Sequence, residues 1–280
     1  MSLLSGTAVQ MGAVMADLDL PVTTESGEKE NGRKHGVPVP NMYIVHQIKD
    51  DMWFGFGITV PYGMATEYNP DWKLSDKGMN AEVKTFDFNP NIAVKLTDTL
   101  SFGAGVSLQY VTAQFESTST TYTEVQGQKV KASQSRVRLN ADGWAWGGNL
   151  GFMWQPTETV RVGLAYRSQV NHKADGSLKT DLTVLTQNGY STQHFKTNDG
   201  HAEMSGPHTI TLTGTWKATD ALRLSGLVRW ANWSSFDKLP ISGTSMAQAA
   251  VAGAHLKGQE ITVDQAKALG KDKVAPEYHW

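Results

Sequence analysis

Residues 99–110 read TLSFGAGVSLQY, and this stretch decides the class of fold. From Phe102 to Tyr110 every second residue is apolar, and the residues between are small or polar. A period of two is typical of a β-strand with one apolar face and one small, polar face. Both a strand that faces water and a strand that faces lipid can show this alternation. The residue patterns of the other strands are needed to distinguish a soluble protein from a membrane barrel.

The composition excludes several classes of protein. The chain has 280 residues, a formal net charge of −2 and no cysteine. This charge does not suit nucleic-acid binding, which usually leaves a strongly basic surface, and without cysteine there are no disulfides or thiolate metal ligands. No run of about 18 apolar residues predicts a transmembrane helix, and residues 1–20 lack the basic start and apolar core of a secretory signal. These observations do not exclude a transmembrane β-barrel, because barrel strands carry a weaker hydropathy signal than transmembrane helices do.

Tight turns alternate with long polar connections along the chain. Each turn joins the end of one strand to a second alternating strand, which is typical of a hairpin. Transmembrane barrels combine short periplasmic turns with long extracellular loops in this way. The turns lie within residues 47–57, 95–105, 154–164 and 216–227, and the expected long loops are 16–38, 65–78, 118–135, 172–201 and 237–270.

The two faces of the strands favour a membrane barrel over a soluble barrel or sandwich. In residues 143–156 (GWAWGGNLGFMWQP), Trp144, Trp146 and Trp154 share one face, while Asn149 and small residues share the other. Aromatic residues at both ends of an apolar band form the girdles of outer-membrane barrels. We therefore predict an all-β fold, an antiparallel transmembrane β-barrel that forms one partial domain over residues 1–280. In the opening stretch, Phe102, Val106 and Leu108 are predicted to face lipid, and Ser101, Ser107 and Gln109 to face the lumen.

Several stretches, in order along the chain, resemble the FadL family of outer-membrane transporters of long-chain fatty acids and aromatic hydrocarbons. The most specific are PYGMATEY within residues 53–68 and LAYRSQV within residues 146–170. The others are 39–45 (VPNMYIV), 100–110 and 230–239 (WANWSSFDKL). The resemblance implies a fourteen-stranded barrel whose lumen is plugged by an N-terminal hatch.

The chain departs from the family pattern at both ends. About nine to ten strands of the expected fourteen are visible, and the next strand would open at residues 276–280 (PEYHW). Residues 6–20 (GTAVQMGAVMADLDL) resemble the first barrel strand of the family, and the family's hatch is expected to be missing before it. We therefore expect a fragment that lacks the hatch and the last strands, and that cannot close a barrel alone, because open sheet edges are not satisfied in lipid.

The resemblance also implies a landing groove for the ligand between the third and fourth long loops, residues 118–135 and 172–201. The second loop carries more apolar residues. An ordinary solvated loop with a few stabilising contacts is the alternative interpretation. The expected ligand contacts in this loop are Leu182, Val184, Leu185, Tyr190 and Phe195.

The family releases its ligand sideways through a gap at a kinked strand, and residues 60–63 (VPYG) match that place. Pro61 cannot donate to a β-ladder and Gly63 has no side chain, so a local break is physically reasonable. A lateral exit at Pro61, Tyr62 and Gly63 is therefore one interpretation. The other is that the strand simply ends there.

A carboxylate head group in the lumen would favour a nearby cation. Arg161 and Arg167 fall on the inward face and are candidate ligand contacts, together with Arg223 and Arg229. Where some family members carry a basic residue, this chain has Ser117, which points to a less polar ligand. The alternative is that the arginines belong to structural networks with acidic residues.

The predicted function is passive diffusion of hydrophobic solutes, such as fatty acids or hydrocarbons, across the bacterial outer membrane. A general porin and a structural or adhesive surface protein are the alternatives. Catalysis, a metal site and cofactors are not expected, because the eight histidines show no HExxH or similar spacing. The expected partners are the hydrophobic ligand and outer-membrane lipid or detergent, with no nucleic acid, and a complete barrel is expected to be monomeric.

Overall fold

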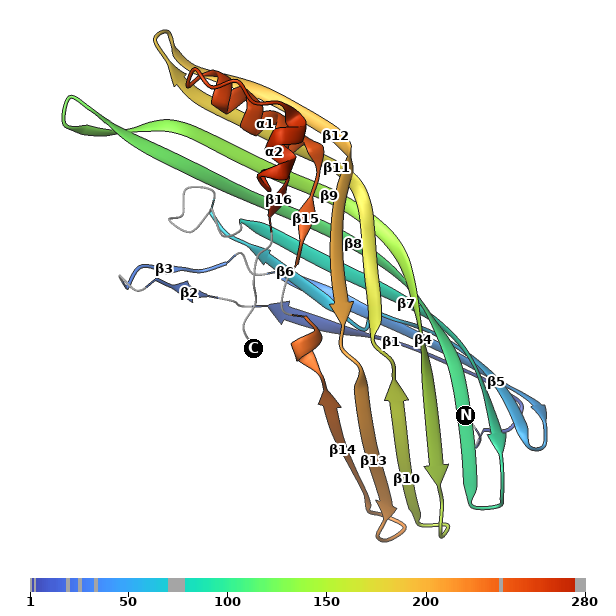
Figure 1. Ribbon diagram of the computed structural model, residues 1–280. Coiled ribbons are helices and arrows are strands. Elements are labelled where there is room, and N and C mark those ends of the chain that lie inside the picture. The colour runs from blue at the N-terminus through green and yellow to red at the C-terminus, as the bar shows by residue number, and fades with distance from the viewer. Residues whose placement is uncertain are drawn as a thin grey trace.

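One curved antiparallel sheet dominates the structure, a computed structural model that describes residues 2, 4–18, 21–24, 27–32, 35–69, 79–236 and 239–274 (Figure 1). Over these residues the chain makes nine crossings of the sheet, and three crossings are broken into two segments. Neighbouring crossings pair in chain order. The unbroken crossings are β1 (Thr7–Leu18), β4 (His35–Lys49), β7 (Asn80–Lys95), β8 (Leu100–Val125), β9 (Gln128–Trp154) and β14 (Arg223–Ala231). The broken ones are β5 (Met52–Thr59) with β6 (Gly63–Glu67), β10 (Val160–Arg167) with β11 (Val170–Thr186), and β12 (Gly189–Gly206) with β13 (Thr209–Lys217).

The sheet forms a wall rather than a closed barrel. Among the described residues, β1 pairs only with β4 and β14 pairs only with β13, so the first and last of the nine crossings are unpaired on one side. The antiparallel all-β prediction is confirmed, and the number of crossings agrees with the predicted nine. The further strand expected at residues 276–280 lies outside the described residues.

The four predicted tight turns are confirmed, and they gather at one end of the sheet, the lower end in Figure 1. Threonine hydroxyls organise two of them. Thr97 Oγ1 accepts hydrogen bonds from the backbone N–H of Thr99 and Leu100, at 3.3 and 3.0 Å, and Thr157 Oγ1 accepts one from Val160 at 3.2 Å. Side chains of this type replace backbone partners in turns.

The third and fourth long loops were predicted wrongly. Residues 118–135 and 172–201 are extended hairpins in which β8 pairs with β9, and β11 pairs with β12, almost to their tips. Their threonines and valines favour strands, and polar side chains on both faces suit a sheet that rises above the membrane into water. The tip of the first hairpin holds Gln126 and Gly127 at φ of 53° and 76°, as the tight mirror-image turns of hairpins require.

The other expected loops are confirmed in part. The loop at residues 16–38 is shorter, since β1 and β4 extend into it, and it contains the small hairpin of β2 (Val22–Thr23) and β3 (Lys29–Glu30). In the loop at 65–78, β6 reaches Glu67 and residues 70–78 lie outside the described residues. The loop at 237–270 contains two helices.

The strand at residues 99–110 has the predicted orientation. Val106 and Leu108 are exposed on the outer face, whereas Ser107 and Gln109 are fully buried on the inner face. The outer face also carries the tryptophans of β9, with Trp146 at 76% exposed. A large apolar outer face is unfavourable in water and favourable in lipid, so this face is the lipid-facing one.

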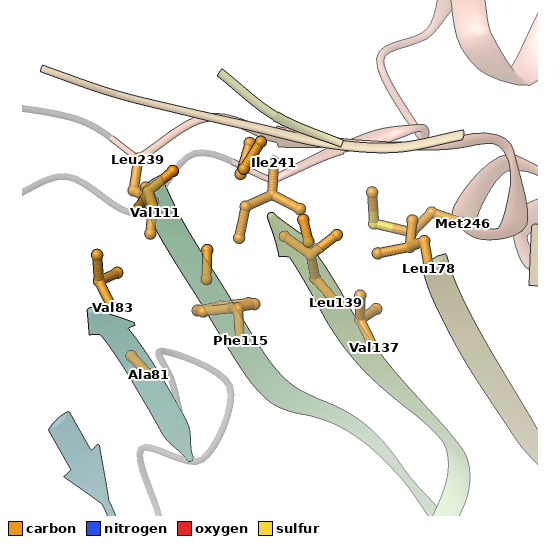
Figure 2. Close-up of a cluster of buried hydrophobic side chains, with 14 residues drawn as sticks. Ala81, Val83, Val111, Phe115, Val137, Leu139, Leu178, Leu239, Ile241 and Met246 are labelled. Atoms are coloured by element: carbon orange, nitrogen blue, oxygen red, sulfur yellow. The ribbon is translucent and has the colours of Figure 1, made fainter. Parts of the chain in front are cut away.

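An apolar cluster fills the concave face of the sheet at the end away from the turns. Val111, Phe115 and Leu139 project from β8 and β9 towards Ile241 and Met246 (Figure 2). These last two residues belong to a segment that follows η1 (Trp233–Ser235) and contains β15 (Ile241–Ser242), α1 (Thr244–His255), α2 (Val263–Ala268) and β16 (Lys273–Val274). Burial of such side chains is worth roughly 1.5–3 kcal/mol each.

Helix α1 lies along β11 and β12 (Figure 1). It buries Met246, Ala247 and Ala249 against the sheet, so it is part of the core. Asp199 on β12 accepts hydrogen bonds from the backbone N–H of Thr244 at 3.2 Å and from its hydroxyl, which satisfies the first turn of the helix. None of the helices in the described part of the chain is long and apolar enough to cross a membrane.

Candidate lumen site

The wall is interrupted between β5 and β6, where a local break was predicted. Thr59 pairs with Asp87 and Gly63 pairs with Lys84, so three residues of one strand face two of β7. This is a β-bulge, which bends a strand and locally ends its pairing. Pro61 lies at its centre and has no N–H to donate.

Thr85 on β7 repairs the hydrogen bonding at this break. Its backbone N–H donates to the carbonyl of Tyr62 at 3.1 Å, and its hydroxyl donates to the same carbonyl at 2.8 Å. The N–H of Tyr62 donates back to the Thr85 hydroxyl oxygen at 3.0 Å. Both peptide groups of Tyr62 are therefore satisfied although the regular ladder is interrupted.

Two further breaks lie across the lumen, at residues 168–169 between β10 and β11 and at residues 207–208 between β12 and β13. Here β9 changes partner, from β10 below to β11 above. The strands approach so closely that a Cβ at Gly143 would lie 2.0 Å from the carbonyl oxygen of Lys173. The Ser168 hydroxyl accepts a hydrogen bond from the N–H of Gly148 at 2.9 Å and bridges the change of partner.

The breaks surround a cavity of about 1020 Å³ in the lumen. Tyr62 reaches across it from the first break, and its hydroxyl donates to the carbonyl of Pro207 at 3.1 Å. The Tyr62 ring also meets Trp233 edge-on, with centroids 6.0 Å apart. Phe56, Met64 and Phe236 add to a predominantly apolar lining. The volume is at the upper limit of the range of ordinary small-molecule sites.

A buried carboxylate anchors the polar side of this cavity. Asp87 has no exposed surface, and its Oδ2 lies 3.0 Å from Nη2 of Arg167, a side chain that is 27% exposed. The Ser107 hydroxyl donates to Asp87, and Gln109 donates to Ser107 at 3.1 Å. The guanidinium of Arg167 is therefore neutralised before any ligand arrives.

The second cation that lines the cavity is Arg229 on β14. Its Nε donates to the hydroxyl of Thr211 at 3.3 Å, and no described carboxylate forms an ion pair with it. An anionic or strongly polar group in the cavity would therefore find its counter-charge at Arg229 more readily than at Arg167.

The structure brings only some of the predicted site residues together. Pro61, Tyr62, Gly63 and Arg167 line the same cavity, whereas Arg161 lies at the other end of β10 and does not line it. Asp87 was missed. The signal that could have found it is an aspartate flanked by two phenylalanines, at an inward position of an otherwise apolar alternation.

The five residues predicted as loop contacts lie on β11 and β12 and divide between the two faces of that hairpin. Leu182 is buried on the inward face of the hairpin, near α1. By register, Val184 and Phe195 lie on this same inward face. Leu185 and Tyr190 pair with each other on the opposite face, and the Tyr190 hydroxyl donates to the carbonyl of Lys131 at 3.1 Å. They do not form one groove. Within the ranges that the structure describes, no three histidine, aspartate or glutamate residues gather as a metal site.

The family model for outer membrane protein transport proteins (OMPP1/FadL/TodX) matches residues 1–267. The chain belongs to this family. As predicted, this FadL/TodX-family chain is a bacterial outer-membrane β-barrel protein, and the family is one of transport proteins rather than enzymes.

Individual relatives agree with this assignment. The long-chain fatty acid transport protein of Escherichia coli O157:H7 is 27% identical over 267 residues, which cover 84% of this chain and 59% of that protein. Outer membrane protein P1 of Haemophilus influenzae strain Rd is 27% identical over 233 residues, which cover 74% and 48%. The FadL/TodX-family chain thus spans about three fifths or less of the length of these relatives.

Two solved structures share the fold. A Pseudomonas aeruginosa FadL homologue superimposes with a TM-score of 0.64 at 19% identity, over 85% of this chain and 61% of that one. The Ralstonia pickettii toluene transporter TbuX gives 0.63 at 19% identity, over 87% and 67%. At this identity the likeness supports the fold alone.

Proposed function

We propose that this FadL/TodX-family chain forms the wall of a channel through which hydrophobic solutes cross the outer membrane by passive diffusion. The observation that carries the proposal is the mainly apolar lumen cavity placed directly beside the break at Tyr62. The named relatives include transporters of long-chain fatty acids and of toluene. A solute of this type gains roughly 0.8 kcal/mol per buried CH₂ group, so it needs few polar contacts.

The solute is proposed to leave sideways, through the bulge at Pro61, Tyr62 and Gly63. First contact is proposed at the β11–β12 hairpin through the predicted residues Leu182, Val184, Leu185, Tyr190 and Phe195. Arg229 is proposed to favour a ligand with one polar end, and Arg167 to be an indirect contact held by Asp87.

Deletion of Pro61 tests the lateral exit, because it leaves two residues opposite two and restores a regular ladder. A complete barrel that contains this chain is expressed in cells without their own long-chain fatty acid transporter, and uptake of labelled oleate and toluene is measured. We expect uptake to fall to the level of the empty vector. Gly214→Ala on β13, away from the bulge, is the control, since an added Cβ at this position meets no atom within 4 Å.

Undiminished uptake after the deletion would exclude the lateral exit. A sugar-swelling assay on the same protein in liposomes separates the general porin from the selective channel. Rapid swelling with sugars, and no preference for oleate or toluene, would refute the proposed selectivity for hydrophobic solutes.

A further inference from the structure

Three cations form a row across the outward face of the extracellular hairpins. Arg138 on β9 lies opposite Lys179 on β11, and Lys179 lies opposite Lys196 on β12. The neighbouring residues Leu139 and Leu178 are buried on the inner face, so by the pleat of the strands these three side chains point outward. We refer to Arg138, Lys179 and Lys196 as the cationic row.

The Lys179–Lys196 pair departs from the charge pattern of its own hairpin. Like charges directly opposite each other destabilise a sheet, and opposite charges stabilise it. The other cross-strand pairs of ionisable residues on this face join a base to an acid. They are Lys173 with Glu203 at 3.6 Å, His201 with Asp175 at 2.6 Å, and His194 with Asp181 at 2.7 Å.

The hairpin neutralises only one of these three cations, Arg138, which forms an ion pair with Asp181. The structure as described shows no carboxylate in an ion pair with Lys179 or Lys196. Asp181 already bonds both Arg138 and His194. Two positive charges that no described carboxylate compensates, on Lys179 and Lys196, therefore remain side by side.

The cationic row lies a short distance above the membrane. Tyr110 and Trp144, with ring centroids 5.0 Å apart, form the aromatic rung at the outer end of the apolar band. Arg138 lies six residues before Trp144 on β9, which is about 20 Å at about 3.3 Å per residue. With the usual strand tilt of roughly 40°, the row stands about 15 Å above that rung. This is the layer of sugars and phosphates of the outer leaflet.

We propose that the cationic row binds the phosphate groups of an anionic glycolipid of the outer leaflet. Phosphate oxygens accept hydrogen bonds from guanidinium and ammonium groups, and their charge would relieve the repulsion between the two lysines. The site faces the lipid layer rather than the lumen. It therefore does not depend on the proposed transport.

The test measures binding of lipopolysaccharide to the immobilised full chain in detergent, for wild type and for Lys179→Gln/Lys196→Gln. Each lysine near an anionic surface contributes roughly a fivefold gain in affinity, so the variant should bind roughly thirtyfold more weakly. Lys129→Gln/Lys131→Gln, near the tip of β9, is the control with the same change of charge and should bind as wild type does. Dephosphorylated lipopolysaccharide and inorganic pyrophosphate are the comparison probes.

Four results would overturn the proposal. They are equal weakening in the control variant, undiminished binding in the test variant, equal binding of dephosphorylated lipopolysaccharide, and equally tight binding of pyrophosphate alone, which would assign the site to a free phosphate. Thermal unfolding in lipid-free detergent adds a check on folding. The test variant should unfold at the wild-type temperature or higher, because a repulsion is removed, and a lower temperature would contradict the argument from repulsion.

Discussion

Asp87→Asn should destabilise the wall by isolating the guanidinium of Arg167. The substitution keeps the shape of the side chain and its ability to accept from Ser107, but it removes the negative charge. Breaking a buried ion pair costs about 3–5 kcal/mol, and because Arg167 keeps some exposure we expect about 2–3 kcal/mol here. Urea unfolding of the detergent-folded chain, followed by tryptophan fluorescence, measures the loss.

A double variant isolates the ion pair from other effects. In Asp87→Asn/Arg167→Gln both charges are absent, so most of the lost stability should return. A double variant as unstable as Asp87→Asn alone would show that the charge of Arg167 is not what destabilises the single variant, and would refute the reasoning. The single variant should also raise the uptake of oleate relative to toluene, because the freed guanidinium can meet a carboxylate.

Three further predictions concern the strand crossings and the extracellular part. Gly143→Val places its side chain against the carbonyl of Lys173 and should cost at least about 3 kcal/mol in urea unfolding, whereas Gly214→Ala, in open space on β13, should cost about 1 kcal/mol or less. Asp199→Ala removes the acceptor at the first turn of α1 and should lower the stability of the helix by about 1–2 kcal/mol. Proteolysis within residues 244–268 should therefore become faster, and an unchanged rate would contradict the capping role of Asp199. The stability that His201 contributes should be fully present below pH 6.5 and be lost as the pH rises through its raised pKa. His201→Gln should therefore flatten this part of the curve of melting temperature against pH. An unchanged curve would refute the stabilising role of protonated His201.

The charges around His201 explain the direction of that pH effect. Hydrogen bonds with Asp175 and then with Glu203 raise the pKa of His201, because both stabilise the imidazolium, although burial opposes them. The folded state therefore binds the proton more tightly than the unfolded chain does. Acidification strengthens these contacts until the carboxylates themselves become protonated.

The sequence predicted the wall well, because its information there is local. The alternation in residues 99–110 depends only on which solvent each face meets, and the turns depend on threonine and aspartate chemistry within a few residues. The break at Pro61 was also predictable, since a missing N–H is a property of the residue itself.

Contacts between distant segments were beyond the sequence. The hairpin at residues 172–201 is rich in polar residues, and such a composition suits a solvated loop as well as a paired strand. The packing of α1 against β11 and the pairing of Asp87 with Arg167 join residues far apart in the chain. Nothing within either segment specifies such a partner, so these features became visible only in three dimensions.

The hydrogen bonds of Thr85 at the bulge have a consequence for the proposed lateral exit of a hydrophobic solute. A gap in a β-sheet usually leaves bare peptide groups, which hold water and repel hydrocarbon. At this gap proline has no amide hydrogen, and a single threonine occupies both peptide groups of Tyr62. At Tyr62 the sheet is therefore interrupted without leaving a peptide group free to hold water.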